Sequence, residues 1–168
     1  KTLLYLGRMH PKKGLDLLIR SFLRQKREGE LLVLAGPLES SDRHITNLQR
    51  ETKEYEDRIL WTDMLEGEMK WGALRYANAL ILPSHQENYG MVVAEACSVG
   101  TPVLLSNKVN LYHEILEDDA GLVENDTQEG IDNLLRHWLS GRVQKKAQNA
   151  RRCFQENLHI YKTTDRLI

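Results

Sequence analysis

The sequence has few cysteines and no close pair of metal ligands. Its two cysteines, Cys97 and Cys153, show none of the short spacing that zinc sites use. No Asp-x-Asp pair that would hold a divalent cation occurs anywhere in the chain. Two separated thiols are typical of a reducing cytoplasm, and Cys97 is expected to be buried in an apolar helix. We therefore expect no metal site, no cofactor and a cytoplasmic location.

Long apolar runs and an excess of one charge are also missing. No run reaches the roughly 18 apolar residues that span a bilayer, and no signal-peptide pattern opens the chain. Lysine and arginine number 23 against 24 aspartates and glutamates, which gives a formal net charge of −1. We therefore expect no transmembrane segment and no binding to nucleic acid as a polyanion. A length of 168 residues predicts one domain.

Six short apolar runs predict the strands of a parallel sheet, because strands buried on both faces are continuously apolar. The runs are Leu3–Leu6, Leu31–Ala35, Ile59–Thr62, Ala79–Leu82, Val103–Leu105 and Leu122–Val123. Helical patterns alternate with them, at 15–27, 42–55, 68–78, 91–99, 111–116, 127–139 and 143–156, and a further segment covers 158–168. This alternation predicts an α/β fold, a Rossmann-like parallel sheet with helices on both faces.

The stretch 83–102, PSHQENYGMVVAEACSVGTP, carries the most informative pattern. A polar loop follows a predicted strand and closes on Gly90, and an apolar helix from Met91 to Val99 comes next. Loops at the carboxyl ends of parallel strands are where open α/β sheets bind ligands. The free N–H groups at the start of the helix would face the same space and favour an anion.

Two glutamates in this stretch are eight positions apart, Glu87 in the loop and Glu95 on the helix. Glu95 lies among apolar residues, and a buried carboxylate needs a partner or a polar ligand because burying it bare is costly. Amides for phosphate together with carboxylates for hydroxyls suit a sugar nucleotide. The alternative is that Glu87 is a solvated loop residue and Glu95 a capping or salt-bridged surface residue.

The loop after the first strand, 7–14, carries Arg8 and Lys13. The loop can turn at Pro11 so that both side chains reach the carboxyl edge of the sheet. A guanidinium and an ammonium that converge there would suit a diphosphate, although basic residues near a turn are often solvated. The pattern G-R-x4-K-G is neither a Walker loop nor G-x-G-x-x-G, so the standard phosphate cradles are absent.

These motifs, taken in order, resemble the C-terminal, donor-binding domain of a GT-B glycosyltransferase of the retaining family 4, or "glycosyl transferases group 1", type. The first signature of that family is formed here by Gly7, Arg8, Lys13 and Gly14. The second is formed by Pro83, Ser84, Glu87, Gly90, Glu95, Ala96, Gly100, Pro102 and Val103. The trailing E-I and A-G-L-V pieces are found at 114–115 and 120–123. The resemblance covers nearly the whole chain.

The resemblance implies a role for each part of the donor site. Its catalytic residues would be Arg8 and Lys13, which bind the diphosphate, and Glu87, which contacts the transferred sugar. The residues expected to bind the donor are Gly7, Arg8, Lys13, Met64, Leu65, Glu87, Asn88, Tyr89, Gly90, Met91, Val92 and Glu95. Among them, the amides of 90–92 meet the phosphates and Glu95 binds the ribose hydroxyls. The base would lie against 63–65, where Asp63 replaces a common glycine and can adopt the left-handed conformation at some cost.

The resemblance also implies the donor-binding half of a retaining hexosyltransferase, which moves a sugar from a UDP-, GDP- or ADP-sugar to an acceptor in cell-surface polysaccharide or glycolipid synthesis. Residues 1–168 would form a single nucleotide-sugar-binding domain, inactive alone, without the N-terminal acceptor domain. Contact with the inner face of the membrane would come through that missing half. Two alternatives stay open, a non-catalytic nucleotide-sugar-binding module and a sugar-nucleotide epimerase of related fold.

Overall fold

The computed structural model describes residues 1–25, 28–38 and 41–158. Within these residues a six-stranded sheet has the order β3-β2-β1-β4-β5-β6, and every pair of neighbours is parallel. The strands are β1 (Thr2–Leu6), β2 (Leu31–Ala35), β3 (Ile59–Thr62), β4 (Ala79–Leu82), β5 (Val103–Ser106) and β6 (Gly121–Glu124). The α/β class and all six predicted strands are confirmed.

The order of the strands reverses between β1 and β4, which are neighbours although 76 residues separate paired positions such as Leu3 and Ala79. The chain runs from β1 to β2 on one side of this point and from β4 to β5 on the other, so the loops after β1 and β4 diverge at the carboxyl edge of the sheet. Open α/β sheets bind their ligands in the crevice at such a switch point. The two loops that carry the sequence signatures are the loops that flank it.

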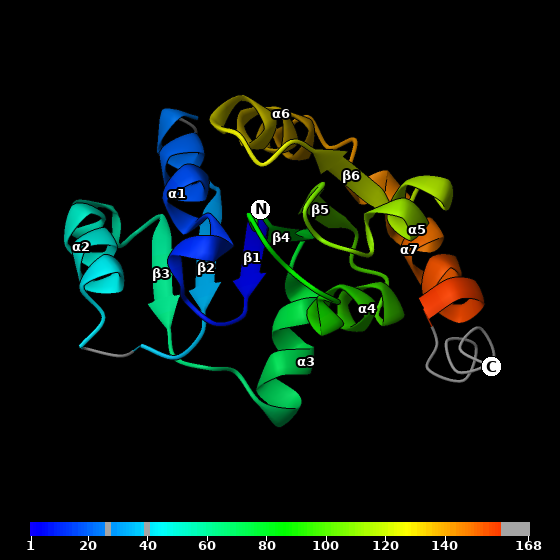
Figure 1. Ribbon diagram of the computed structural model, residues 1–168, viewed down its shortest axis with the longest axis horizontal. Coiled ribbons are helices and arrows are strands. Elements are labelled where there is room, and N and C mark those ends of the chain that lie inside the picture. The colour runs from blue at the N-terminus through cyan, green and yellow to red at the C-terminus, as the bar shows by residue number, and fades with distance from the viewer. Residues whose placement is uncertain (26–27, 39–40, 159–168) are drawn as a thin grey trace.

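Helices cover both faces of the sheet, as predicted (Figure 1). They are α1 (Leu15–Arg24), α2 (Arg43–Glu51), α3 (Gly67–Tyr76), α4 (Met91–Ser98), α5 (Tyr112–Glu117), α6 (Gln128–Leu139) and α7 (Ala147–Cys153). Helices α1 and α6 pack together on one face, whereas α4 contacts α3 and α7 on the other. The sheet is therefore a buried central layer, and only its edges and strand ends meet solvent.

Two of the predicted helices are shorter than their sequence patterns. The polar segment 42–55 is helical to Glu51 and then forms a 3-10 turn, because the Thr52 hydroxyl donates to the carbonyls of Leu48 and Gln49. The basic segment 143–156 divides into a 3-10 turn, α7 and a π-helical turn over Phe154–Leu158. The predicted segment after Leu158 lies outside the described residues.

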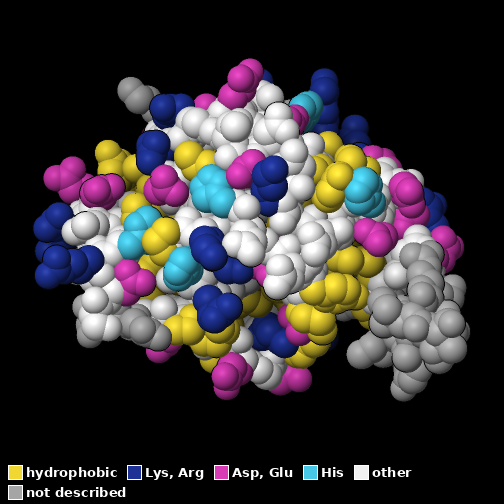
Figure 2. Space-filling model, in the orientation of Figure 1, with side chains coloured by type: hydrophobic (Ala, Val, Ile, Leu, Met, Phe, Trp, Pro, Cys, Tyr) yellow, Lys and Arg dark blue, Asp and Glu magenta, His cyan; other side chains and the backbone are white. Residues whose placement is uncertain are grey.

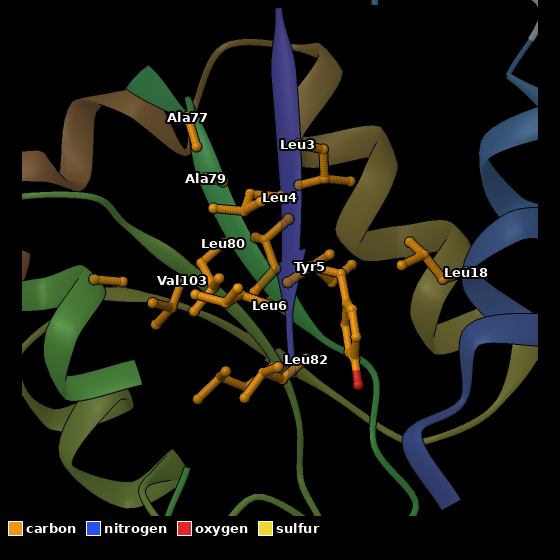
Figure 3. Close-up of a cluster of buried hydrophobic side chains, with 14 of the residues drawn as sticks. Leu3, Leu4, Tyr5, Leu6, Leu18, Ala77, Ala79, Leu80, Leu82 and Val103 are labelled. Atoms are coloured by element: carbon orange, nitrogen blue, oxygen red, sulfur yellow. The ribbon is translucent and has the colours of Figure 1, made fainter. Parts of the chain in front are cut away.

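The core forms around β1 (Figure 3). Successive side chains of this strand point to opposite faces, so Leu3 and Tyr5 lie toward α1 while Leu4 and Leu6 lie toward the other layer. All four are at most 4% exposed. Tyr5 is the only one of these four side chains with a polar group. Its hydroxyl points toward the carboxyl end of the strand, where the candidate site lies.

Both cysteines are free and buried, as expected for Cys97. Burial raises the pKa of the Cys97 thiol from 9.0 to about 12, and burial also raises the pKa of Cys153. The folded state therefore keeps these protons at a pH where the unfolded chain releases them. The contribution of the two thiols to the free energy of unfolding is present well below pH 9 and is lost progressively as the pH rises through and above that value.

We predict that the free energy of unfolding decreases as the pH rises from 8 to 10.5, with a slope that approaches about 1.4 kcal/mol per pH unit for Cys97. Urea titrations at several pH values measure it. The variant Cys97→Ala should start less stable at pH 8 and show a shallower decline. An equally steep decline in this variant would mean that the thiol is not responsible.

Candidate functional site

The loop after β1 is a tight turn that brings its basic residues to the edge of the sheet. A 3-10 helix, Pro11–Lys13, begins at His10, whose ring nitrogen Nδ1 accepts a hydrogen bond from the Lys12 amide at 3.1 Å. Gly14 ends it in the left-handed conformation, with φ at 69°, and starts α1. The proline sets the first helical φ angle, and the glycine supplies the positive one. Lys13 is thereby fixed on a short rigid turn.

The buried side chain of Tyr5 supports the loop after β1. Its hydroxyl donates to the Arg8 carbonyl at 2.6 Å. Burial raises the pKa of Tyr5, the negative charge of Glu87 raises it further, and the charge of Arg8 opposes the rise. Tyr5 is thus a neutral donor at physiological pH. The Arg8 guanidinium is exposed and makes no hydrogen bond or ion pair with any residue that the structure describes.

The loop after β4, 83–90, packs directly on the first loop. A Cβ atom placed on Gly14 would lie 2.3 Å from the Pro83 carbonyl oxygen, so only glycine allows this approach. The His85 amide donates to the Lys12 carbonyl at 2.8 Å. The two signature loops are therefore joined through their main chains.

The main chain of Glu87 is held in place by the loop that follows β5. Its amide donates to the Lys108 carbonyl, and its carbonyl accepts from the Asn110 amide, each at 3.2 Å. These bonds form a short parallel bridge between Glu87 and Val109. The glutamate backbone is therefore fixed, and only its side chain can turn toward or away from the site.

The side chains of Lys13 and Glu87 form an ion pair between the ammonium and carboxylate oxygen Oε2. Their side chains are 14% and 21% exposed, so the pair is largely withdrawn from water. Sequence reasoning placed both residues at the site but did not predict that they pair. One pair of charges thus joins the residues expected at the diphosphate and at the sugar.

Helix α4 starts in the same region. Gly90 has a left-handed conformation, with φ at 70°, and no side chain caps the helix. The amides that open α4 are therefore available to an anion. The predicted apolar helix is confirmed. Its first residue, Met91, is nevertheless 59% exposed.

Glu95 lies on α4 and has the partner that its position required. Its carboxylate oxygen Oε1 accepts a hydrogen bond from the Lys70 ammonium of α3 at 2.8 Å. Each side chain of this pair is 25% exposed. This contact agrees with the salt-bridged alternative for Glu95, and it leaves the second carboxylate oxygen for a ligand.

A cavity of about 460 Å³ lies between the two signature loops and the segment from β2 to α2, which contributes Pro37, Asp42 and Ile45. Its lining includes four of the predicted site residues, Arg8, Lys13, Glu87 and Asn88. Basic and histidine side chains gather over this region of the surface (Figure 2). The other predicted donor-binding residues do not line it, namely Gly7, Met64, Leu65, Tyr89, Gly90, Met91, Val92 and Glu95. The cavity thus brings together Arg8, Lys13, Glu87 and Asn88, but none of the residues expected at the base or the ribose.

The loop after β3, expected at the base, differs from prediction in one respect. Asp63 does not have a positive φ, so the left-handed conformation considered for it is wrong. Its carboxylate oxygen Oδ1 instead accepts from the Met64 amide at 2.8 Å and stabilises the turn. Met64 is exposed, whereas Leu65 packs partly against the core. Of the two expected base contacts, Met64 is therefore the more exposed.

Sequence reasoning missed Tyr5 and Lys70. A hydroxyl at the end of an apolar strand is a weak signal for Tyr5, and no local pattern marks Lys70. His85, in the loop after β4, lies 2.9 Å from the Asp126 carboxylate through its ring nitrogen Nδ1. Among the described residues, no three histidine, cysteine, aspartate or glutamate side chains are arranged to hold a metal ion. None of the helices described is long and apolar enough to cross a membrane.

Comparison with known proteins places these features in a family. Residues 1–156 match the family model described as "Glycosyl transferases group 1". The D-inositol 3-phosphate glycosyltransferase of Kineococcus radiotolerans is 28% identical over 169 residues, which cover 90% of this chain and 39% of that protein. The chain thus spans about two fifths of the length of this curated relative.

Solved structures show the same fold. The C-terminal domain of the glycosyl transferase group 1 protein LpcC from Francisella tularensis has a TM-score of 0.80 and 19% identity, covering 95% of this chain and 86% of that one. Anabaena Alr3699/HepE in complex with UDP-glucose has a TM-score of 0.80 and 17% identity, covering 98% and 48%. The parallel sheet and its flanking helices are the Rossmann-like half of a GT-B fold.

Proposed function

Because the chain belongs to the glycosyl transferases group 1 family, we propose that it is the donor-binding half of a retaining glycosyltransferase that uses a nucleoside-diphosphate sugar. The observation that carries the proposal is that Arg8 and Lys13 line one cavity with Glu87 and Asn88, which belong to the loop that leads to the uncapped start of α4. Both loops follow the strands that flank the switch point of the sheet. These groups would offer two cations and several amides to one anion. Glu87 and Glu95 would accept hydrogen bonds from hydroxyls of the sugar and the ribose.

The chemistry follows from the charge that develops on the leaving group. As the bond from the anomeric carbon to the diphosphate breaks, negative charge collects on the departing oxygens. Fixed donors aimed at that charge usually make the largest contribution to catalysis. Arg8, Lys13 and the α4 amides would supply it, and Glu87 would orient the sugar rather than form a covalent bond with it. We propose that these groups act without a divalent metal ion.

Lys13 can serve the diphosphate without leaving Glu87. An ammonium has three donors, and Glu87 takes one of them. The pair would hold Lys13 ionised and in place before the donor binds, which lowers the cost of ordering the site. The same pair would bring the Glu87 carboxylate next to the phosphate that carries the sugar.

We also propose the substrates of the whole protein. A UDP-, GDP- or ADP-sugar would be the donor, and an N-terminal domain outside this chain would bind the acceptor. Residues 1–168 would then be a single nucleotide-sugar-binding domain, inactive alone. Synthesis of cell-surface polysaccharide or glycolipid in the cytoplasm, at the inner face of the membrane, would fit such an enzyme.

A melting screen of the chain against UDP, GDP, ADP and their sugars tests this function. One of them should raise the Tm by several degrees at about a hundred times its Kd, since binding then adds about 2.7 kcal/mol of stability. EDTA should leave the shift unchanged. Glu95→Ala should weaken nucleotide binding by about tenfold, because it removes a charge-assisted hydrogen bond, yet lower stability by about 1 kcal/mol at most.

Three outcomes would contradict the proposal. The first is the absence of any nucleotide-dependent shift, and the second is a shift that EDTA abolishes. The third concerns Glu95→Ala alone: a large loss of stability with unchanged nucleotide affinity would make this glutamate structural.

A further inference from the structure

Lys70 holds the carboxylate that the proposed function assigns to the ribose. The Lys70 ammonium donates to oxygen Oε1 of Glu95 at 2.8 Å. Oxygen Oε2 accepts no hydrogen bond from the residues that the structure describes. The carboxylate is therefore fixed at one oxygen and free at the other.

The lysine itself is restrained from a second side. Its ammonium lies 4.9 Å from the ring centroid of Trp71, a distance at which cation–π attraction operates. Its amide donates to the Glu66 carbonyl in the first turn of α3, directly after the loop expected at the base. Lys70 thus stands between the expected base loop and Glu95 in a defined position.

We propose that Lys70 is a positioning residue for ribose recognition. By holding Oε1 it would turn Oε2 toward the site, where that oxygen accepts hydrogen bonds from the ribose hydroxyls. A half-buried carboxylate without this partner would be free to rotate toward water, so its hydrogen bonds to the ribose would cost more to form. Lys70 would therefore set the preference of the site for ribonucleotides. This inference rests on the proposed function.

Two other roles of Lys70 make different predictions. The pair joins α3 to α4. Helix α3 has few other buried contacts, because Leu74 is its one buried side chain among those described. A structural tie would therefore affect stability without affecting the choice of nucleotide. A lysine that contacted the phosphates directly would raise the affinity for all nucleotides equally, whether or not they carry ribose hydroxyls.

Calorimetric titration separates these roles. The probes are the nucleoside diphosphate that stabilises the chain most and its 2′,3′-dideoxy counterpart. The wild-type chain should prefer the ribonucleotide by about tenfold or more. In Lys70→Met the preference should fall to about threefold or less, while the affinity for the dideoxy compound stays within about twofold. An unchanged preference, or a parallel loss of both affinities, would overturn the inference.

A double variant shows whether Lys70 acts through Glu95. In a Glu95→Gln background the change Lys70→Met should have no further effect on the preference, and an additional loss there would contradict the proposal. Arg24→Met is the matched control, since it breaks an ion pair between α1 and Asp132 of α6 and should leave the preference intact. If Lys70→Met does not fold, Lys70→Gln takes its place. A wild-type chain that binds no nucleotide would contradict the proposed function itself.

Discussion

Replacing Arg8 by alanine is expected to lower the turnover of the active enzyme that contains this chain by about a hundredfold or more, which corresponds to about 2.7 kcal/mol of transition-state stabilisation. The guanidinium has no partner among the described residues, so its charge would be available to a leaving diphosphate. Tyr5 bonds to the main-chain carbonyl of Arg8. The substitution therefore keeps the support of the loop and removes only the charge.

Steady-state kinetics of Arg8→Ala and of a surface control measure this effect. Arg20→Ala is the control, because Arg20 lies on the outer side of α1 in an exposed pair with Asp16. The control should retain its rate. Lys13→Ala should also lose about a hundredfold, but it leaves Glu87 without its partner and so lowers stability as well. Rates near wild type for Arg8→Ala would remove the diphosphate assignment.

Gly14→Ala is expected to have the largest effect on stability, a loss of about 2–5 kcal/mol of unfolding free energy. A left-handed conformation costs a non-glycine residue about 1–2 kcal/mol, and overpacking adds about 1–3 kcal/mol. Both terms apply because φ at Gly14 is 69° and the new Cβ would lie 2.3 Å from the Pro83 carbonyl oxygen. Moving the two signature loops apart should also weaken nucleotide binding.

Gly72→Ala provides the matched control for this prediction. Gly72 lies inside α3, and a Cβ there would meet no heavy atom within 4 Å. Alanine is the better helix former, so this variant should gain about 0.5–1 kcal/mol. Urea denaturation measures both changes. Equal stability of Gly14→Ala and wild type would show that the close contact between the loops is not needed.

The strands were predictable because their burial on both faces makes them continuous apolar runs, such as Ala79–Leu82, ended by proline or glycine. The order of the strands was not predictable. Strands β1 and β4 are neighbours in the middle of the sheet, although their paired residues are 76 positions apart in the sequence. Helix ends were less certain. Thr52 stops α2 through side-chain bonds to the preceding turn, and sequence periodicity does not register such a bond.

At the site, sequence identified the residues but not their partners. Arg8, Lys13 and Glu87 are recognisable from local motifs, and the structure gathers them around one cavity. The pairing of Lys13 with Glu87 spans 74 positions, and that of Lys70 with Glu95 spans 25. Such contacts depend on how the loops and helices pack. Whether these residues bind the donor stays a prediction.

The most direct test is a titration of the isotope-labelled chain with the nucleoside diphosphate that stabilises it most, followed by the backbone amide NMR signals. The largest shifts should fall on the amides of Gly90, Met91 and Val92 and on the loop that carries Arg8 and Lys13. Unchanged signals at the start of α4, with shifts elsewhere on the molecule, would contradict the proposed donor site.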